Sequence, residues 1–175
     1  MPTLNFDGNF SAKERKILSR TFRSNCNELG ISKCDCSVAL RKDPIGSPRH
    51  RGFILTLEPD QFIVVLNRNL FNLYEAISTL GHEAVHIKQT IEGKLVDCEG
   101  GCLWNKNFIP REIAESEIFY DMLPWEQEAT KLQSTLHKQA VHSLPLEDVK
   151  HVMEIAKAAI MDEPMRVDYS KLPAT

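Results

Sequence analysis

Apolar side chains recur at helical spacing in the middle of the chain and predict its longest helix. Over residues 70–91, leucine, isoleucine and alanine lie three or four positions apart and form one continuous stripe. Gly93 follows this segment, and a glycine in that position favours the end of a helix. The stripe occupies one face, which leaves the opposite face for polar side chains.

Two runs with a strand-like composition precede this helix. Residues 52–57 and 61–67 are rich in isoleucine, leucine, valine and phenylalanine, and a Glu-Pro-Asp turn separates them. Such a pair predicts a β-hairpin. A short strand is also expected over residues 37–40. The segment between them, residues 41–52, contains two prolines and two glycines and predicts a loop.

The N-terminal part of the chain carries a helix with clear end signals. Ser11 is followed three positions later by Glu14, which is the pattern of a capping box. Gly30 then predicts the stop. We therefore expect an amphipathic helix over residues 11–29.

The C-terminal third is predicted to be helical. A helical pattern covers residues 111–122, where a run of acidic side chains is expected to be a solvated face. This pattern breaks at Pro124, which suits the first turn of a further helix over residues 125–141. A last helix is expected to open near residue 143 and to end near Met161.

Residues 92–110 show no period and contain three glycines and two cysteines, which predicts a long surface loop. Loops of this length are uncommon in a compact domain, so this one is a candidate for a functional role. It also carries Trp104. That side chain either lines a substrate cleft or, as is commoner for a lone tryptophan, pins the loop to the body of the protein.

Composition and charge narrow the class of protein. The 175 residues suffice for one domain with a hydrophobic core, and 42% hydrophobic with 26% charged residues is ordinary for a globular chain. The net charge of −3, without a basic block, gives no reason to expect nucleic acid as a partner. We expect a single α+β domain over residues 1–163 and an irregular tail over residues 164–175.

The chain shows no sign of export or of membrane insertion. Its first residues lack the apolar run and small-residue cleavage site of a signal peptide. The apolar runs are far too short to cross a bilayer. A cytoplasmic location is therefore expected. In that setting five cysteines, an odd number, are expected to be reduced thiols rather than a disulfide framework.

The polar face of the helix predicted over residues 70–91 carries the sequence TLGHEAVHIKQ. His82 and His86 are four positions apart, so both imidazoles project from one face and can bind the same zinc ion. Glu83 points beside the metal, where a carboxylate can take a proton from a zinc-bound water and return it to a leaving amine. The pattern predicts a catalytic Zn²⁺ site that needs a third protein ligand.

The sequence PWEQEAT supplies two candidates for that ligand, Glu126 and Glu128. Residues two positions apart on a helix point about 200° apart, so both cannot face the metal. Glu126 is preferred, with Glu128 as the alternative third ligand. Tyr120, six residues before Glu126, is a candidate catalytic residue that donates a hydrogen bond to an oxyanion. The alternative for Tyr120 is simple packing at a helix end.

Other side chains that can bind metal do not extend this site. Cys34 with Cys36 and Cys98 with Cys102 form two close pairs that could build a second, structural zinc site, although their spacing favours buried thiols. The histidines at positions 137 and 142 do not share a helix face and are expected to be solvated. The histidine at position 50 is expected to lie on the surface.

HEAVH is the HExxH signature of the zincin metallopeptidases, and a glutamate on a second helix resembles their gluzincin branch. From the hairpin through TLGHEAVHIKQ to PWEQEA, residues 52–140 are similar to small single-domain gluzincins and to phage-encoded metallopeptidases with HExxHxxQ and PWExEA patterns. This resemblance implies a zincin-like fold in which a small sheet or hairpin packs on the active-site helix and further helices follow. It also implies Zn²⁺ held by His82, His86 and Glu126.

Thr130 departs from the pattern of these families, which often carry an acidic residue or asparagine at that position. The polar partner of one zinc-binding histidine is therefore not identified by sequence. The expected function is a zinc-dependent metallopeptidase that acts on a peptide or protein, with Glu83 as general base. The alternative is a zincin-like binding or regulatory protein, such as a phage factor acting on a host protein, in which zinc is structural or vestigial. A further hypothesis is that the tail covers the cleft and inhibits the enzyme.

Overall fold

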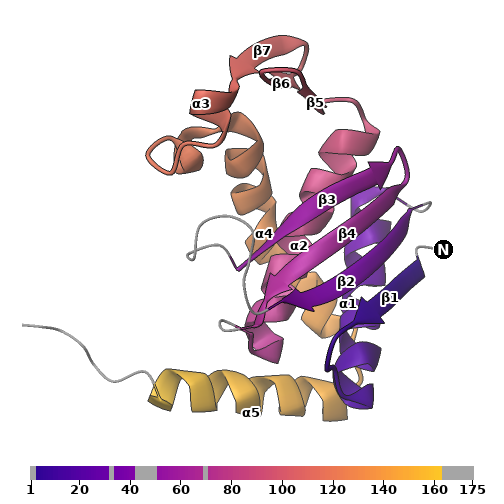
Figure 1. Cartoon of the computed structure of the whole chain (residues 1–175). Helices are drawn as coiled ribbons and strands as arrows, with labels where there is room; N and C mark the ends of the chain where they lie inside the picture. Colours follow the sequence, from indigo (N-terminus) through magenta and orange to yellow (C-terminus); the bar gives the residue numbers. More distant parts are fainter. Residues whose placement is uncertain (1–2, 32–33, 42–50, 69–70, 163–175) are drawn as a thin grey trace, which may run out of the picture.

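A four-stranded and a three-stranded sheet organise the computed structural model, which describes residues 3–31, 34–41, 51–68 and 71–162 (Figure 1). The described chain is of the α+β class. In chain order, its elements are β1 (Thr3–Asp7), α1 (Ala12–Leu29), β2 (Asp35–Arg41), β3 (Gly52–Glu58), β4 (Gln61–Asn67), α2 (Leu73–Ile91), β5 (Leu95–Cys98), β6 (Gly101–Trp104), β7 (Asn107–Pro110), α3 (Arg111–Ala114), the 3₁₀ turn η2 (Tyr120–Met122), α4 (Pro124–His142) and α5 (Leu146–Asp162).

The larger sheet has the strand order β1-β2-β4-β3. Strands β1, β2 and β4 are parallel, and α1 makes the crossover between β1 and β2. Strand β3 runs antiparallel to β4 at the edge of the sheet, which confirms the predicted hairpin. Strand β2 is longer than the predicted segment over residues 37–40. Strand β1 was not among the predicted elements, although Leu4 and Phe6 alternate with polar residues, because a single alternating run of five residues is a weak signal.

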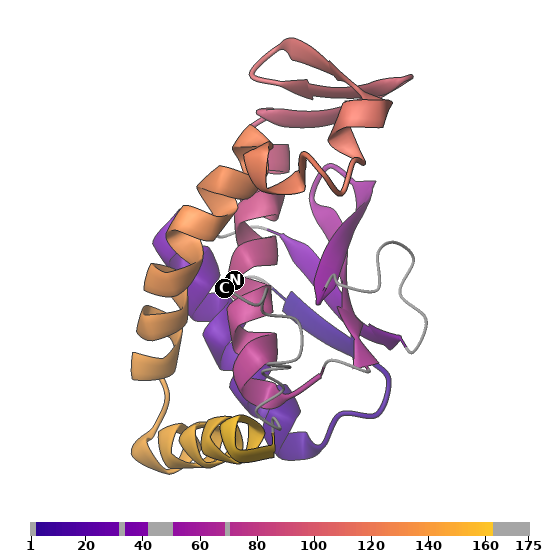
Figure 2. The ribbon, with the colours of Figure 1, turned by 90° about the vertical axis from the view of Figure 1, so that its left-hand side faces the viewer.

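Helices α1 and α2 lie on one face of the larger sheet, and α4 lies on the same side (Figure 2). Alternate residues of β2 and β4 point toward these helices and are buried; they are Cys36, Val38, Leu40, Phe62, Val64 and Leu66. The predicted apolar stripe of α2 packs into the same core. Helix α4 lies against both α1 and α2, so α2 has neighbours on several sides. This packing makes α2 a rigid support for side chains on its remaining face.

Two glycines allow other elements to approach α2 closely. A Cβ atom at Gly52, the first residue of β3, would lie 2.7 Å from Cγ2 of Thr79 on α2. A Cβ atom at Gly81 would lie 3.3 Å from Nδ2 of Asn25 on α1 and 3.5 Å from Cβ of Leu136 on α4. Larger side chains at these positions would push the elements apart. The edge strand and both neighbouring helices are therefore held tightly around the middle of α2.

The predicted ends of the first two long helices are largely confirmed. Ser11 and Glu14 form the capping box of α1, and Gly30 ends the helix with a φ of 73°. Helix α2 ends at Ile91, as predicted, but begins at Leu73 rather than at residue 70. The side chain of Asn72 accepts a hydrogen bond from the backbone N–H of Glu75, and this cap sets the start.

The prediction of a long loop over residues 92–110 is wrong, because this segment forms the antiparallel sheet β5-β6-β7. Its strands have four residues each and join through tight turns. Asn105 and Lys106 both have positive φ, the conformation of a two-residue hairpin turn that glycine usually signals. A Cβ atom at Gly101 would lie 2.1 Å from the carbonyl oxygen of Ile109, so β6 and β7 can pair only because this residue is glycine.

The predicted helix over residues 111–122 is also wrong. Only α3, with four residues, and the turn η2 are helical in this segment. Ile118 is 84% exposed and Met122 is 67% exposed, so the apolar side chains do not form a stripe that could be buried against a neighbour. Without burial on one face, a helix of this length is not stabilised.

The two C-terminal helices are confirmed. Proline occupies the first turn of α4, and α5 ends within one residue of its predicted end. None of the described helices is both long enough and apolar enough to cross a membrane. The predicted tail over residues 164–175, the histidine at position 50 and most of the predicted loop before β3 lie outside the described residues.

Candidate metal centre

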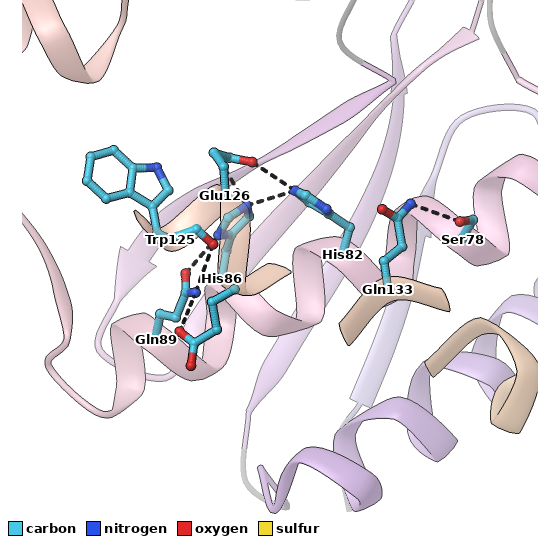
Figure 3. Close-up of polar contacts among 8 residues, drawn as sticks. Ser78, His82, His86, Gln89, Trp125, Glu126 and Gln133 are labelled. Atoms are coloured by element: carbon cyan, nitrogen blue, oxygen red, sulfur yellow. Dashed lines mark hydrogen bonds and ion pairs between the residues drawn. The ribbon is translucent and has the colours of Figure 1, made fainter. Parts of the chain in front are cut away.

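Two histidines of α2 and one glutamate of α4 meet at a single point (Figure 3). Nε2 of His82 lies 3.0 Å from Oε2 of Glu126, and Nε2 of His86 lies 3.3 Å from Oε1 of the same carboxylate. The two Nε2 atoms are 3.0 Å apart. Among the residues that the structure describes, these three form the group of side chains that could hold a metal ion.

The backbone positions of these three side chains follow from the packing of their helices. His82 and His86 are one turn apart on α2, on the face left open by the buried stripe. Glu126 lies in the first turn of α4, which Leu123 and Trp125 anchor because both are buried. Since α2 and α4 pack against each other, the carboxylate is brought to the imidazoles from a position forty or more residues away in sequence.

The donor set fits a small divalent cation. Imidazole nitrogen and carboxylate oxygen are common ligands of zinc, and two atoms bound tetrahedrally at about 2.1 Å from one ion lie about 3.4 Å apart. The observed separations of 3.0 and 3.3 Å differ little from that value. Only small side-chain adjustments would be needed for a metal ion to bind all three donors.

The charges of the site favour a cation between the three groups. Burial alone would raise the pKa of Glu126, but hydrogen bonds from His82 and His86 outweigh burial and lower the pKa to about 2. Burial alone would lower the pKa of His86, but the hydrogen bond to Glu126 and the charge of Glu83 raise it to about 9. The carboxylate is thus strongly stabilised as an anion, in the form that binds metal.

Glu83 lies beside this group and faces a cavity of about 230 Å³. Its side chain is 4% exposed, and burial raises the pKa of the carboxyl above its usual value. His86, Glu126 and Tyr120 line the same cavity, together with Trp125 and the first residues of β3. A buried carboxylate at a cavity wall is well suited to exchange protons with a molecule bound there.

Tyr120, placed by η2 at the entrance to α4, also contacts this group. Its phenol forms a hydrogen bond with Glu126, and that bond helps to lower the pKa of the carboxyl. Burial, followed by the charge of Glu126, raises the pKa of Tyr120, so the phenol keeps its proton. The protonated hydroxyl is therefore a hydrogen-bond donor at the cavity wall.

Glu128 points away from the three donor atoms. Its Oε2 accepts a hydrogen bond of 2.9 Å from Nε2 of Gln89, and its Oε1 lies 3.5 Å from Nζ of Lys94. Gln89 in turn places Oε1 at 2.8 Å from Nδ1 of His86. Sequence analysis left the polar partner of one histidine unidentified, and Gln89 is such a partner for His86.

The small sheet packs over one end of α4. The rings of Trp104 on β6 and Trp125 on α4 are 6.1 Å apart at an angle of 53°. Cys102, Leu123 and Trp125 form a second apolar cluster with Trp104 and Tyr120 at its margin. The contact made by Trp104 is the pinning role considered from sequence, and it fixes the position of the small sheet relative to the cavity.

Among the residues that the structure describes, the other histidines and the cysteines are not part of the group formed by His82, His86 and Glu126. His137 is half-buried, its ring lies 4.7 Å from that of Tyr74, and burial lowers its pKa, so the prediction that it is solvated is wrong. The spacing of the two histidines does not reveal that Tyr74 of α2 lies against the ring of His137. His142 is exposed, as predicted. All five cysteines are free thiols, and all except Cys98 are buried, which agrees with the thiol interpretation.

No family model, curated protein or solved structure matches this chain. Two imidazole nitrogens, one carboxylate and a buried second carboxylate beside a cavity form a combination that can bind a cation and exchange protons next to it.

Proposed function

We propose that this protein is a zinc-dependent hydrolase with a zincin-like fold, and specifically a metallopeptidase. The observation that carries the proposal is the convergence of His82, His86 and Glu126 next to a cavity that His86, Glu126 and Glu83 line. Three protein ligands next to an accessible space are typical of catalytic rather than structural zinc. The HExxH spacing and the glutamate on a second helix point to the same class.

Zn²⁺ bound by these three residues would polarise the scissile carbonyl and acidify a water molecule. Glu83 then acts as general base and takes a proton from the water as its oxygen bonds to the carbonyl carbon. As the C–N bond breaks, Glu83 gives the proton to the amine nitrogen. The raised pKa of this buried carboxyl supports the role, because a catalytic base works best with a pKa closer to the working pH.

Tyr120 has a supporting role in this proposal. Negative charge develops on the carbonyl oxygen during attack, and a neutral phenol can donate a hydrogen bond to it. Tyr120 meets both requirements, since it lines the cavity and its raised pKa keeps it protonated. Its hydrogen bond to Glu126 would be exchanged for one to the substrate.

The edge strand β3 favours a peptide as the substrate. Gly52, Phe53 and Ile54 line the same cavity as Glu83, and β3 is the outermost strand of its sheet. An extended peptide can add to such an edge through backbone hydrogen bonds. A chain bound in this way would run past the three metal-binding side chains with its carbonyl groups exposed to them.

The replacement Glu83→Gln tests the mechanism. We expect zinc to bind as before, because Glu83 is not a ligand, and cleavage of a mixed peptide library to fall by about 10²–10⁴-fold. Glu154→Gln, an exposed position on α5, is the matched control and should leave cleavage unchanged. Cleavage that survives Glu83→Gln would overturn the mechanism.

The same measurements separate the enzyme from the binding-protein alternative. A regulatory protein with a structural metal would bind zinc and yet cleave no member of the library at any zinc concentration. Such a result for the unmodified protein would favour the alternative over the proposal.

A further inference from the structure

The side-chain amide of Gln89 has only one favourable orientation. Nε2 donates to the backbone carbonyl oxygen of Trp125 at 3.1 Å and to Oε2 of Glu128 at 2.9 Å. Rotating the amide by 180° would place its carbonyl oxygen against two acceptors. Because Gln89 is 1% exposed, water cannot relieve that repulsion. The carbonyl oxygen of Gln89 must therefore face Nδ1 of His86, which lies 2.8 Å away.

This orientation determines which nitrogen of His86 carries the proton in the neutral ring. An amide oxygen accepts but cannot donate, so Nδ1 must be the protonated nitrogen. The lone pair is then on Nε2, the atom that faces His82 and Glu126. In the other tautomer, Nδ1 of His86 and Oε1 of Gln89 would face each other as two acceptors, and the N–H of Nε2 would point toward the metal.

We propose that Gln89 and Glu128 are positioning residues that hold His86 in its metal-binding tautomer. Glu126 and Glu128 thus act at different ring nitrogens of His86. Glu126 completes the donor set near Nε2, and Glu128 fixes the Gln89 amide that accepts from Nδ1. The inference rests on the metal site of the proposed function, but it does not depend on catalysis.

Lys94 extends this arrangement to the protein surface. Its Nζ lies 3.5 Å from Oε1 of Glu128 and 3.1 Å from Oε2 of Glu92, and its backbone N–H donates to the backbone carbonyl oxygen of Gln89 at 2.8 Å. Lys94 immediately precedes β5. The orientation of Glu128 is thus tied to the point where the chain leaves α2 and enters the small sheet.

The test compares Gln89→Met with Gln127→Met. Methionine has nearly the size of glutamine but cannot accept from His86, whereas Gln127 is an exposed glutamine on α4. We expect Gln89→Met to weaken the binding of zinc, measured by chelator competition, by about 10- to 100-fold. Gln127→Met should leave it unchanged. Equal affinities in the two variants would overturn the proposal.

Glu128→Leu provides a second variant in case Gln89→Met does not fold. Trp125 still accepts from Gln89 in this variant, so the amide keeps part of its orientation and zinc binding should weaken by roughly tenfold or less. A zinc affinity of Glu128→Leu equal to that of the unmodified protein would show that Glu128 does not position His86.

Nitrogen-15 NMR of the zinc-loaded protein reads the tautomer directly. We expect His86 to show a metal-bound Nε2 and a protonated Nδ1 whose hydrogen exchanges slowly with water, and we expect Gln89→Met to speed that exchange. Coordination through Nδ1 would contradict the inference even if peptides are cleaved.

If the unmodified protein bound no zinc, both the inference and the proposed function would fail. If it bound zinc but cleaved nothing, the inference would stand while the enzyme proposal would not.

Discussion

Glu126 and Glu128 belong to the same helix and act on opposite sides of one imidazole, Glu126 directly and Glu128 through Gln89. Glu126 lies 3.3 Å from Nε2 of His86, while Glu128 reaches Nδ1 through Gln89. Because residues two positions apart on a helix point in nearly opposite directions, the two carboxylates cannot both face the histidines, and the sequence alone shows this. Which of them faces the histidines depends on how α4 docks on α2, and that is a property of the packed core.

Titration of His86 predicts how the stability of the metal-free protein depends on pH. The pKa of this imidazole rises from 6.5 to about 9 on folding. A raised pKa stabilises the fold fully below 6.5, and that contribution is lost as the pH rises through about 9. We expect the urea midpoint, measured with a chelator present, to fall between pH 6.5 and 9 for this reason.

The variant His86→Asn is the control, because it lacks the titrating group. Its urea midpoint should be lower at pH 6.5 but should change less between pH 6.5 and 9 than that of the unmodified protein. Two parallel pH profiles would show that His86 is not the group responsible.

Sequence reasoning at the residue scale succeeds where the side chains share one helix. The spacing of His82, Glu83 and His86 determines their relative directions without any knowledge of the fold. Gln89 lies on the same helix, but its partners Trp125 and Glu128 come from α4, more than thirty residues further along the chain. Contacts of this range leave no periodic signal, so the bonds of Gln89 to α4 could not be predicted, although its i,i+3 spacing from His86 is visible in the HExxHxxQ pattern.

At the scale of elements, the three-stranded sheet β5-β6-β7 depends on one glycine. A side chain at Gly101 would meet the carbonyl oxygen of Ile109 at 2.1 Å from its Cβ. We expect Gly101→Ala to separate β6 from β7 and to lower the free energy of unfolding by more than about 2 kcal/mol, or to unfold the small sheet locally. Limited proteolysis should then cut within this sheet.

Gly93→Ala is the matched control for that prediction. Gly93 has a φ of 65° but open space around it, so only the left-handed backbone penalty of about 1–2 kcal/mol applies. We expect Gly93→Ala to lower the global free energy of unfolding without causing new proteolytic cleavage within the small sheet. Similar proteolysis patterns for the two variants would contradict the steric explanation.

Elements with strong local signals were predicted, and elements formed by tertiary contact were not. The capping box of α1, the stripe of α2 and the hairpin β3-β4 are each encoded within one continuous segment. Strands β5, β6 and β7 are too short to show alternation, and the turn at Asn105 and Lys106 lacks the usual glycine. The central position of β2 likewise follows from its partners on both sides.

At the scale of the whole molecule, the candidate metal centre takes its side chains from both α2 and α4. Ligands that bind only the folded state stabilise it, by about 2.7 kcal/mol at a concentration one hundred times the Kd. For a domain of this size that corresponds to a rise in Tm of about 5–10 °C. We expect zinc to produce this rise and a chelator to reverse it, as measured by thermal unfolding.

Glu126→Ala removes the ligand that α4 contributes, so it should abolish the rise in Tm on adding zinc. Glu154→Ala on α5 serves as the control and should respond to zinc as the unmodified protein does. A full zinc response in Glu126→Ala would show that the ion is held elsewhere.

Both tryptophans of the chain, Trp104 and Trp125, lie at the contact between the small sheet and α4. The tryptophan fluorescence of the protein therefore comes from one place, next to the cavity that Trp125 lines. Any shift of the small sheet when a molecule enters that cavity would change the polarity around these indoles. The intrinsic fluorescence of the protein is thus a local optical probe of its own cleft.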